Sequence, residues 1–590
     1  MSLDVARSIA VSSLMATQVQ ISVASANIAN ASTTGYTKKT AVQSATVSGG
    51  VGTGTTITAI TSNVDKLLLK SLVGATSDLG AANTNSDYLD QLQALYGSTT
   101  GTDSTGTSLA NTLASLETAL SSLSSTPSSA ALQANAVSAL DDVASQLRDT
   151  SDGIQTLRNN ADTAISTSVD DVNTQLKTIA SLNTQIKLAA ASGQSTGDLE
   201  DQRNTALQDV ASQMNVSYFI SSSGDMQVYT ASGQALVDSS AHELSFTASS
   251  SVTANSTYDP TSSNGLSGIS VNGVDVTAQI SSGTIGALIS ERDTVLPAAQ
   301  AQLDELANQL TSSLNAVSNS GTSVPPPATL TGTTAVTADT ALSATGTVRI
   351  AVADSSGNLV SSADIDLSGI TTVGGLVDAI NNSGISGLTA SINSSGNVVL
   401  ATTSSSNGVS INEMTSAVGS PAVGLSDYLG LNDLVTGTGA SNIAVRSDIL
   451  NNSGLLPAAT LSSSTTLTTG SSVLSSGSAT VVNALYSALT GNTSFSATGG
   501  LGASTGSFAD YAADIVSNVA SKASAASTTL TAKQTTLSTF SSAMSSQSGV
   551  NLDEETAAIS TLQNQYTAAS QLIQSINSMF SALMTAVQST

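Results

Sequence analysis

The two ends of this chain carry almost no charge, and no other feature of the sequence constrains its fold as much. No charged residue stands between Arg7 and Lys38, and none follows Glu555. A buried charge needs a partner, whereas small polar side chains tolerate crowding. We therefore expect both ends to be packed on all sides, first against each other and then against further copies of the chain.

The segment after Glu555 repeats its apolar residues at alternating spacings of three and four, which predicts a coiled-coil helix of about four heptads. Asn551, followed by Glu554 and Glu555, is typical of a helix start. The N-terminal segment has a weaker form of the same repeat, with small residues at one heptad position. The residues predicted to form the coiled-coil and subunit interfaces are Leu3, Leu14, Ile21, Ile28, Ile559, Leu562, Tyr566, Ile573, Ile576, Phe580, Leu583 and Val587.

An ordinary core helix would show the same apolar stripe, and this alternative stays open for the C-terminal helix. Burying about eight large side chains contributes roughly 1.5–3 kcal/mol for each of them. Ordering about thirty residues costs roughly 1–2 kcal/mol for each residue before hydrogen bonds are counted. The burial term is smaller than the ordering cost, so one buried stripe is marginal by itself. We therefore expect the ends to be poorly ordered in the single chain and to fold on assembly.

Composition excludes most catalytic chemistry. The chain has no cysteine, and His242 is its only histidine. His242 stands in strand-like sequence without a nucleophile motif nearby, so a strand or loop histidine is the favoured interpretation. The aspartates near Asp354 and Asp366 lack the spacing of a calcium loop. We predict that the protein is not an enzyme and that it holds no metal or other cofactor.

The net charge of −26 excludes some partners and environments. An acidic surface of this kind repels nucleic acid and anionic lipid. The first residues show no basic segment followed by an apolar run, so we expect no cleavable signal peptide. We also expect no membrane insertion, because no window resembles the roughly 20 apolar residues of a membrane span.

The fold class predicted by these patterns is a multi-domain, mainly α protein with β insertions. Periods of 3.6 residues indicate long helices, and short alternating runs indicate strands. The expected parts are a paired terminal coiled-coil domain (1–42 and 555–590), a long-helix bundle core domain (43–215, 284–325 and 480–554), a β-rich domain (216–283) and a β-rich variable outer domain with a linker (330–479). The two β-rich domains are thus nested in the middle of the chain.

The segment that runs from Ala26 to Tyr36 resembles the N-terminal signature of flagellar rod, hook and other axial proteins. Its signature residues are Asn27, Ile28, Ala29, Asn30, Gly35 and Tyr36. The family usually has Pro-Gly-Tyr at the end of this motif, whereas this chain has Thr34 before Gly35, as hook proteins do. The motif alone indicates an axial flagellar protein.

Blocks farther along the chain resemble the flagellar hook-associated protein 1 family. They include the Asp-Leu-Glu-Asp-Gln-Arg run at 198–203, the block from Gly283 to Ala307 and the block at 548–555 with Gln565-Tyr566. These matches stand in family order at both ends and in the middle. Rod and hook proteins share the ends of this pattern and lack the middle blocks.

The resemblance implies a structural subunit of the bacterial flagellum at the junction between hook and filament. It implies an extracellular location reached by type III export, and self-association in a ring or short tube. The implied partners are the hook protein, a second junction protein and through it flagellin, with an export chaperone at the C-terminal helix. A hook subunit is the nearest alternative, and a secreted S-layer or adhesin-type surface protein is a further one.

Overall fold

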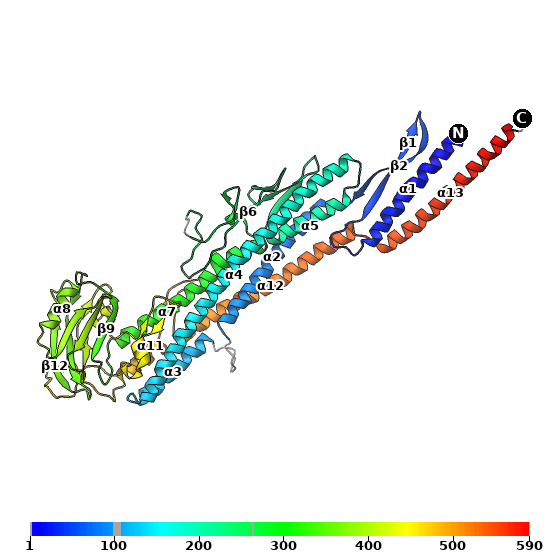
Figure 1. Cartoon of the computed structure of the whole chain (residues 1–590). Helices are drawn as coiled ribbons and strands as arrows, with labels where there is room; N and C mark the ends of the chain where they lie inside the picture. The colour runs from blue at the N-terminus through cyan, green and yellow to red at the C-terminus, as the bar shows by residue number, and fades with distance from the viewer. Residues whose placement is uncertain (1–2, 98–107, 262–264, 589–590) are drawn as a thin grey trace.

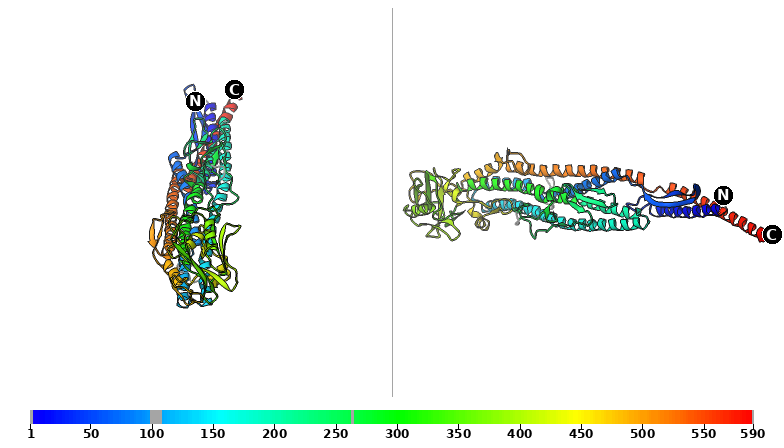
Figure 2. Two further views of the ribbon diagram at one scale, coloured as in Figure 1. Left: turned by 90° about the vertical axis from the view of Figure 1, so that its left-hand side faces the viewer. Right: turned by 90° about the horizontal axis from the view of Figure 1, so that it is seen from above.

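The computed structural model describes residues 3–97, 108–261 and 265–588. The molecule is a long rod in which both chain ends lie at one tip and a compact β-rich part lies at the other (Figures 1 and 2). Long helices run along the rod between the two tips. This arrangement agrees with the predicted fold class, because the middle of the sequence lies farthest from the paired ends.

Helices form the body of the rod. Their bounds are α2 (Lys66–Leu95), α3 (Leu109–Ser125), α4 (Ala130–Ala191), α5 (Gly197–Gln213), α6 (Gly283–Ser290), α7 (Leu296–Ser318), α11 (Thr480–Thr490) and α12 (Phe508–Ser548). Helix α4 is 62 residues long and starts at an N-cap, where the Ser129 hydroxyl accepts a hydrogen bond from the Leu132 amide. Helix α12 starts with a capping box between Ser507 and Asp510. Such caps satisfy amide groups that the helix itself leaves unpaired.

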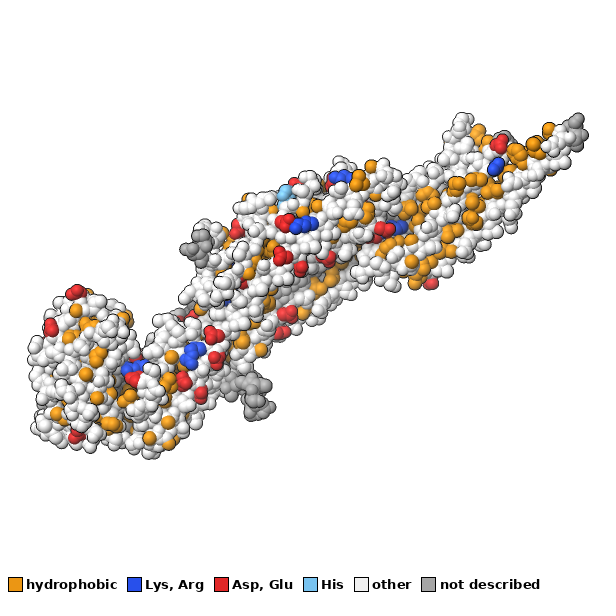
Figure 3. All heavy atoms as spheres, viewed as in Figure 1, with side chains coloured by type: hydrophobic (Ala, Val, Ile, Leu, Met, Phe, Trp, Pro, Cys, Tyr) orange, Lys and Arg blue, Asp and Glu red, His pale blue; other side chains and the backbone are white. Residues whose placement is uncertain are grey.

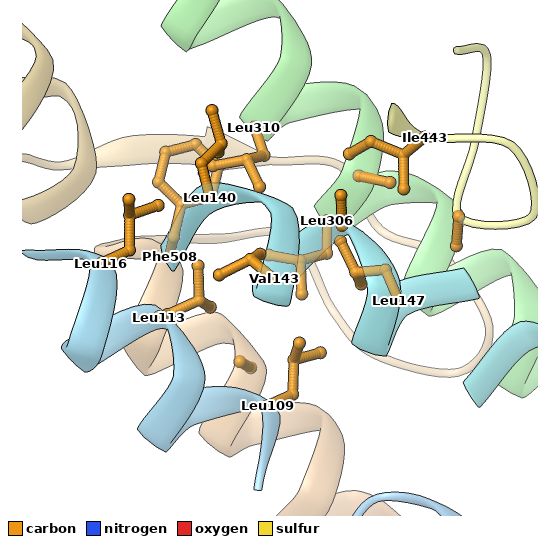
Figure 4. Packing of buried hydrophobic residues seen from close by; sticks show 14 of the residues in the cluster. Leu109, Leu113, Leu116, Leu140, Val143, Leu147, Leu306, Leu310, Ile443 and Phe508 are labelled. Atoms are coloured by element: carbon orange, nitrogen blue, oxygen red, sulfur yellow. The ribbon is translucent and has the colours of Figure 1, made fainter. Parts of the chain in front are cut away.

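One hydrophobic cluster holds the outer half of this body together (Figure 4). Regularly spaced leucines lie along α3, which packs against α4, α11 and α12, as the helical periodicity predicts. The side chains labelled in the figure are Leu109, Leu113, Leu116, Leu140, Val143, Leu147, Leu306, Leu310, Ile443 and Phe508. Ile443 lies within 330–479, the predicted outer domain, but it packs with the helices of the body.

Two small antiparallel sheets lie against α4 and α5. Their strands are β3 (Val216–Ile220), β4 (Met226–Thr230) and β5 (Ala235–Val237), then β6 (Leu244–Ser245), β7 (Ser270–Val271) and β8 (Val274–Asp275). Met226, Val228 and Val271 share one buried cluster with Val172 of α4 and Leu207 of α5. The strands of segment 216–283 therefore bury their apolar side chains on the helical body.

The β-rich tip has a core of its own. It contains β9 (Thr329–Ala335), β11 (Thr347–Asp354), β12 (Leu359–Asp366), α8 (Val373–Asn381), β13 (Leu388–Ile392), β14 (Asn397–Thr402) and β15 (Asn407–Asn412). Two three-stranded sheets, β12-β11-β15 and β13-β14-β9, form most of it. The hydroxyl of Thr372 caps α8 by accepting a hydrogen bond from the Gly375 amide.

A turn of π-helix, Glu291–Val295, separates α6 from α7, where the apolar pattern predicts one continuous helix. It places the Glu291 side chain in the interior, at 1% exposure, with one carboxyl oxygen lacking a hydrogen-bond partner. Burial raises the pKa of Glu291 to about 8, although the positive charge of Lys522 on α12 opposes this shift. The next residue, Arg292, is also buried, and its Nη1 atom lies 2.7 Å from Oδ1 of Asp162 on α4.

Candidate assembly site

Both ends of the chain are helices, and they pair with each other. Helix α1 (Leu3–Ala29) runs antiparallel to α13 (Leu552–Gln588), and both project from the body of the rod (Figure 1). Small residues of α1, including Ala10, Thr17 and Ala24, are buried. Such residues allow two helices to approach closely, as the heptad pattern predicts. Both ends are helical in the structure, although only part of the α13 stripe is buried. That the ends become fully ordered only on assembly stays a prediction.

The predicted interface residues differ in how far the helix pair buries them. Ile576 is buried, and the half-buried ones are Leu3, Leu14, Ile21, Ile28, Ile559, Leu562, Ile573 and Phe580. Tyr566, Leu583 and Val587 are exposed. Helix α13 has 37 residues and α1 has 27, so the last turns of α13 extend past the start of α1. The seam of the pair thus ends near Phe580.

Several large apolar side chains of the two helices are exposed. We define them as the apolar terminal surface: Met15, Val19, Tyr566, Leu572, Met579, Leu583, Met584 and Val587. Figure 3 shows hydrophobic side chains along this end of the rod with few charged ones beside them. A large exposed apolar patch marks an interaction surface on a soluble protein.

The signature residue Asn27 stands at the centre of a buried hydrogen-bond network below the helix pair. Its Nδ2 donates to the backbone oxygen of Lys39 at 2.9 Å and to Oε2 of Glu555 at 3.0 Å. Its Oδ1 accepts from the Tyr36 hydroxyl and from the Lys39 amide, both at 3.0 Å. One amide side chain thereby joins the end of α1, the segment after it and the start of α13.

The network continues into the body of the rod through Asp201 of α5. Its carboxylate accepts hydrogen bonds from the Thr37 amide at 2.9 Å, from the Thr37 hydroxyl at 2.7 Å and from Lys39 Nζ. Lys39 Nζ also lies 4.4 Å from the centre of the Tyr36 ring. The first aspartate of the same block, Asp198, lies 3.6 Å from Lys39 Nζ but is largely exposed.

A second set of contacts ties the same segment to the C-terminal helices. Lys38 Nζ lies 2.9 Å from Oε1 of Glu555 and 3.1 Å from Oε2 of Glu554. Hydrogen bonding to Glu555 raises the pKa of Lys38, which keeps the ammonium group charged. The Lys38 amide donates to the carbonyl oxygen of Ser548, the last residue of α12, at 2.8 Å. Segment 37–39 therefore contacts α1, α5, α12 and α13.

The remaining signature residues shape the turn after α1. Gly35 has a φ of +79°, and a Cβ atom there would stand 2.6 Å from Oγ1 of Thr205, so any other residue is both strained and obstructed. Burial and the nearby carboxylates raise the pKa of Tyr36 to about 12, so its hydroxyl keeps the proton that it donates to Asn27. Asn30 Nδ2 donates to the carbonyl oxygen of Ala26 at 3.0 Å, and Ala29 is exposed.

Sequence reasoning missed the roles of Lys38, Lys39 and Asp201. A signal for one of them was present, because Lys38 and Glu555 are the residues at which the two charge-free ends stop. Because Lys38 and Glu555 carry opposite charges, their positions at the two boundaries are compatible with an ion pair between them. Nothing in the sequence indicated that Asp201 of the middle block would lie against the segment after α1.

Helix α1 corrects one expectation. Its mean hydropathy of 1.3 over its most apolar window, together with its length, makes it long and apolar enough to cross a membrane, whereas we expected no such segment. Core helices and signal sequences have the same properties, and here α1 packs against α13. In the part of the chain that the structure describes, no group of three or more His, Asp or Glu side chains could hold a metal ion.

Comparison with protein families agrees with this architecture. The family description "Flagellar hook-associated protein FlgK helical domain" matches residues 89–334. Residues 8–37 match a flagellar basal body rod protein family, and residues 541–586 match the C-terminal part of the basal body rod FlgEFG proteins. Residues 347–404, in the β-rich tip, match the flagellin hook IN motif.

Individual relatives carry related names. Flagellar hook-associated protein 1 of Escherichia coli K12 is 25% identical over 39% of this chain and 42% of the relative. Flagellar hook-associated protein 1 of Salmonella typhimurium LT2 is 23% identical over 53% of this chain and 56% of the relative. In these segments the chain is similar to the flagellar hook-associated protein 1 family. It spans about half the length of the curated relatives that it matches.

A solved structure has a similar fold. The flagellar hook junction protein FlgK from Burkholderia pseudomallei matches 80% of this chain and 99% of its own, with a TM-score of 0.50 and 16% identity. At that identity the match supports the fold alone. The signature block and the Asp-Leu-Glu-Asp-Gln-Arg block, which carried the resemblance in the sequence, are connected in space through segment 37–39, which contacts both Asn27 and Asp201.

Proposed function

We propose that the chain is a structural subunit of the bacterial flagellum that forms the junction between hook and filament. The observation that carries this proposal is the terminal helix pair: it is fixed to the rod by buried contacts of Asn27 and Glu555, and it exposes the apolar terminal surface. An elongated subunit with an exposed apolar surface at one tip is suited to a tubular wall. In such a wall the two chain ends face inward and the middle of the chain faces outward.

In this proposal the predicted interface residues act at two levels. The seam around Ile576 holds the two helices of one copy together. Tyr566, Leu583 and Val587, which are exposed in the single chain, contact neighbouring copies in a ring or short tube. The terminal helices, the helical body and the two β-rich parts then serve as separate domains. Their boundaries are those predicted from the sequence, except that the segment around Ile443, predicted within the outer domain, packs with the helical body.

The proposed partners follow from the similarity to flagellar hook-associated protein 1. Below the ring lies the hook protein, and above it lies a second junction protein that connects to flagellin. The protein reaches this extracellular position by type III export, with a chaperone on the C-terminal helix. The exposed apolar side chains of α13 support the proposal of a chaperone, because an exposed apolar helix surface favours aggregation until it is bound by a partner. We propose no catalytic role, in keeping with a family of structural flagellar proteins.

Reconstitution on isolated hook–basal bodies tests the junction role. The purified full chain is added first, then the second junction protein and flagellin, and the products are viewed by electron microscopy. A short cap that permits filament growth supports the proposal. Long tubes would identify a hook subunit instead, and failure to bind hooks would contradict both. Chains lacking residues 1–40 or 556–590 are expected to fail, while a chain lacking the core of the β-rich tip, 330–431, keeps hook binding.

A further inference from the structure

The hairpin of β1 (Lys39–Ser48) and β2 (Val51–Ser62) carries a surface that nothing in the single chain covers. Val42 is 41% exposed, Val47 64% and Val51 50%. No charged residue stands between Lys39 and Asp65. Proteins normally protect an exposed hairpin with charged side chains or a covering element, because uncovered strands recruit other chains. We call Val42, Val47 and Val51 the hairpin surface.

The hairpin has a fixed position on the terminal helix pair. Its ladder has two strands only, and it packs on α1. The Thr55 amide donates to the Ser12 hydroxyl at 3.1 Å, and Gln20 Nε2 donates to Gln43 Oε1 at 3.2 Å. Figures 1 and 2 show the hairpin beside α1 at the same end of the rod as α13. The hairpin surface and the apolar terminal surface thus lie at one level along the rod.

The charge of the chain indicates what kind of partner fits the hairpin surface. Two copies that each carry a net charge of −26 repel one another over most of their surfaces. They can approach where both are free of charge. In the described parts of the chain, the hairpin surface and the apolar terminal surface both meet that condition, and both expose large apolar side chains.

We infer that the hairpin surface of one copy binds the apolar terminal surface of a second copy. This inference rests on the proposed function, because it names the contact by which copies would join. The contact is heterologous: one copy offers its valines, and the other offers α1 and α13. Heterologous contacts repeat from copy to copy and close into a ring or continue as a helical tube, whereas a contact between two identical surfaces would stop at a dimer.

The absence of cysteine makes a clean cross-linking test possible. One full-length variant carries Val47→Cys, and two others carry Met15→Cys or Leu583→Cys. Each variant is oxidised alone and in pairwise mixtures, both concentrated in solution and after addition to hook–basal bodies. We expect cross-linked dimers from a mixture of Val47→Cys with at least one helix variant, and at least about tenfold fewer from Val47→Cys alone. Matched mixtures with Leu188→Cys on α4, also 64% exposed, control for random collision.

The outcomes separate this inference from the junction role. Absence of the mixed cross-link both in solution and on hooks overturns the inference, and so does equal cross-linking of Val47→Cys alone, which would indicate hairpin-to-hairpin pairing. Normal hook caps without the mixed cross-link leave the junction role standing. Mixed cross-links without hook binding overturn the junction role and support the inference. A second variant, Val47→Asp, is expected to lower self-association at least about tenfold relative to Leu188→Asp.

Discussion

The Nζ atom of Lys38 lies 2.9 Å from Oε1 of Glu555, and these two residues are the boundaries of the two charge-free ends. The Lys38 side chain is partly exposed, whereas that of Glu555 is 6% exposed. The other carboxylate oxygen of Glu555 accepts a hydrogen bond from Asn27. Charge in the terminal region is thus concentrated where the helix pair meets the body and is scarce along the helices beyond it.

Replacing Glu555 with alanine is expected to loosen the helix pair from the body. The change leaves the buried Nδ2 of Asn27 without one of its acceptors, a loss of about 1–3 kcal/mol. Amide exchange in α1 should therefore become roughly 5- to 150-fold faster in native-state hydrogen-exchange measurements. Glu554→Ala is the matched control, because Glu554 also contacts Lys38 but is 64% exposed. Equal effects of the two variants would contradict a special role for the buried carboxylate.

The contact between Asp201 and segment 37–39 gives a second prediction. Asp201→Asn removes the charge that faces Lys39 Nζ, and an amide cannot accept with both of its terminal atoms from Thr37 and Lys39. We expect faster proteolytic cleavage within residues 30–40, with little change in the unfolding of the helical body. Asp198→Asn should leave the cleavage rate unchanged, since Asp198 is exposed and more distant from Lys39. Unchanged cleavage in Asp201→Asn would show that the turn is held by α1 and α13 alone.

The stability of the helical body should fall as the pH rises, because of Glu291. Its pKa in the folded protein is about 8, above the ordinary value of 4.5, so the folded state keeps a proton that the unfolded state releases. This stabilisation is fully present below about pH 4.5 and is lost as the pH rises through 8. The other groups that face Glu291 are Lys522 on α12 and Tyr88 on α2, whose pKa is raised to about 12 by burial and by the charge of Glu291.

Urea unfolding between pH 5 and pH 9 measures this effect. The free energy of unfolding is expected to decrease over that range by a few kcal/mol, about 1.4 kcal/mol for each pKa unit of difference. Glu291→Gln keeps a neutral side chain of similar shape and should remove most of the decrease. A decrease of the same size in Glu291→Gln would assign the pH dependence to other groups.

Sequence patterns predicted the elements whose apolar period is long and regular. The heptad after Glu555 corresponds to α13, and the leucine spacing from Leu109 to Leu123 corresponds to α3. Residues 283–318 form one unbroken helical run, but it contains a π-helical turn in which Glu291 and Arg292 are buried. Two neighbouring charged residues in a sequence indicate a solvent-exposed position. The buried partner of Arg292, Asp162, is brought close only by the tertiary fold.

The candidate site was predicted in part for a similar reason. Heptad spacing indicates which residues of α1 and α13 face each other, because that depends on local geometry. The contacts of Asn27 with Lys39 and of Thr37 with Asp201 depend on where three distant segments meet. Exposure of Leu583 depends on the relative lengths of the two helices, and the repeat itself gives no sign of where pairing stops.

Two alanine substitutions on α13 should have opposite effects. Ile576 is 4% exposed in the seam, so Ile576→Ala is expected to cost about 2–5 kcal/mol of pairing stability and to speed amide exchange in α1. Leu583 is 54% exposed, so Leu583→Ala should change stability by less than about 0.5 kcal/mol. If the apolar terminal surface joins copies, Leu583 should matter more than Ile576 for hook binding. Leu583→Ala, and more strongly Leu583→Asp, should lower cap formation on hook–basal bodies. The single chain of each variant should keep its helix pair. Normal caps from Leu583→Asp would remove this end of α13 from the assembly contacts, because a charge placed in an apolar contact between copies has no partner.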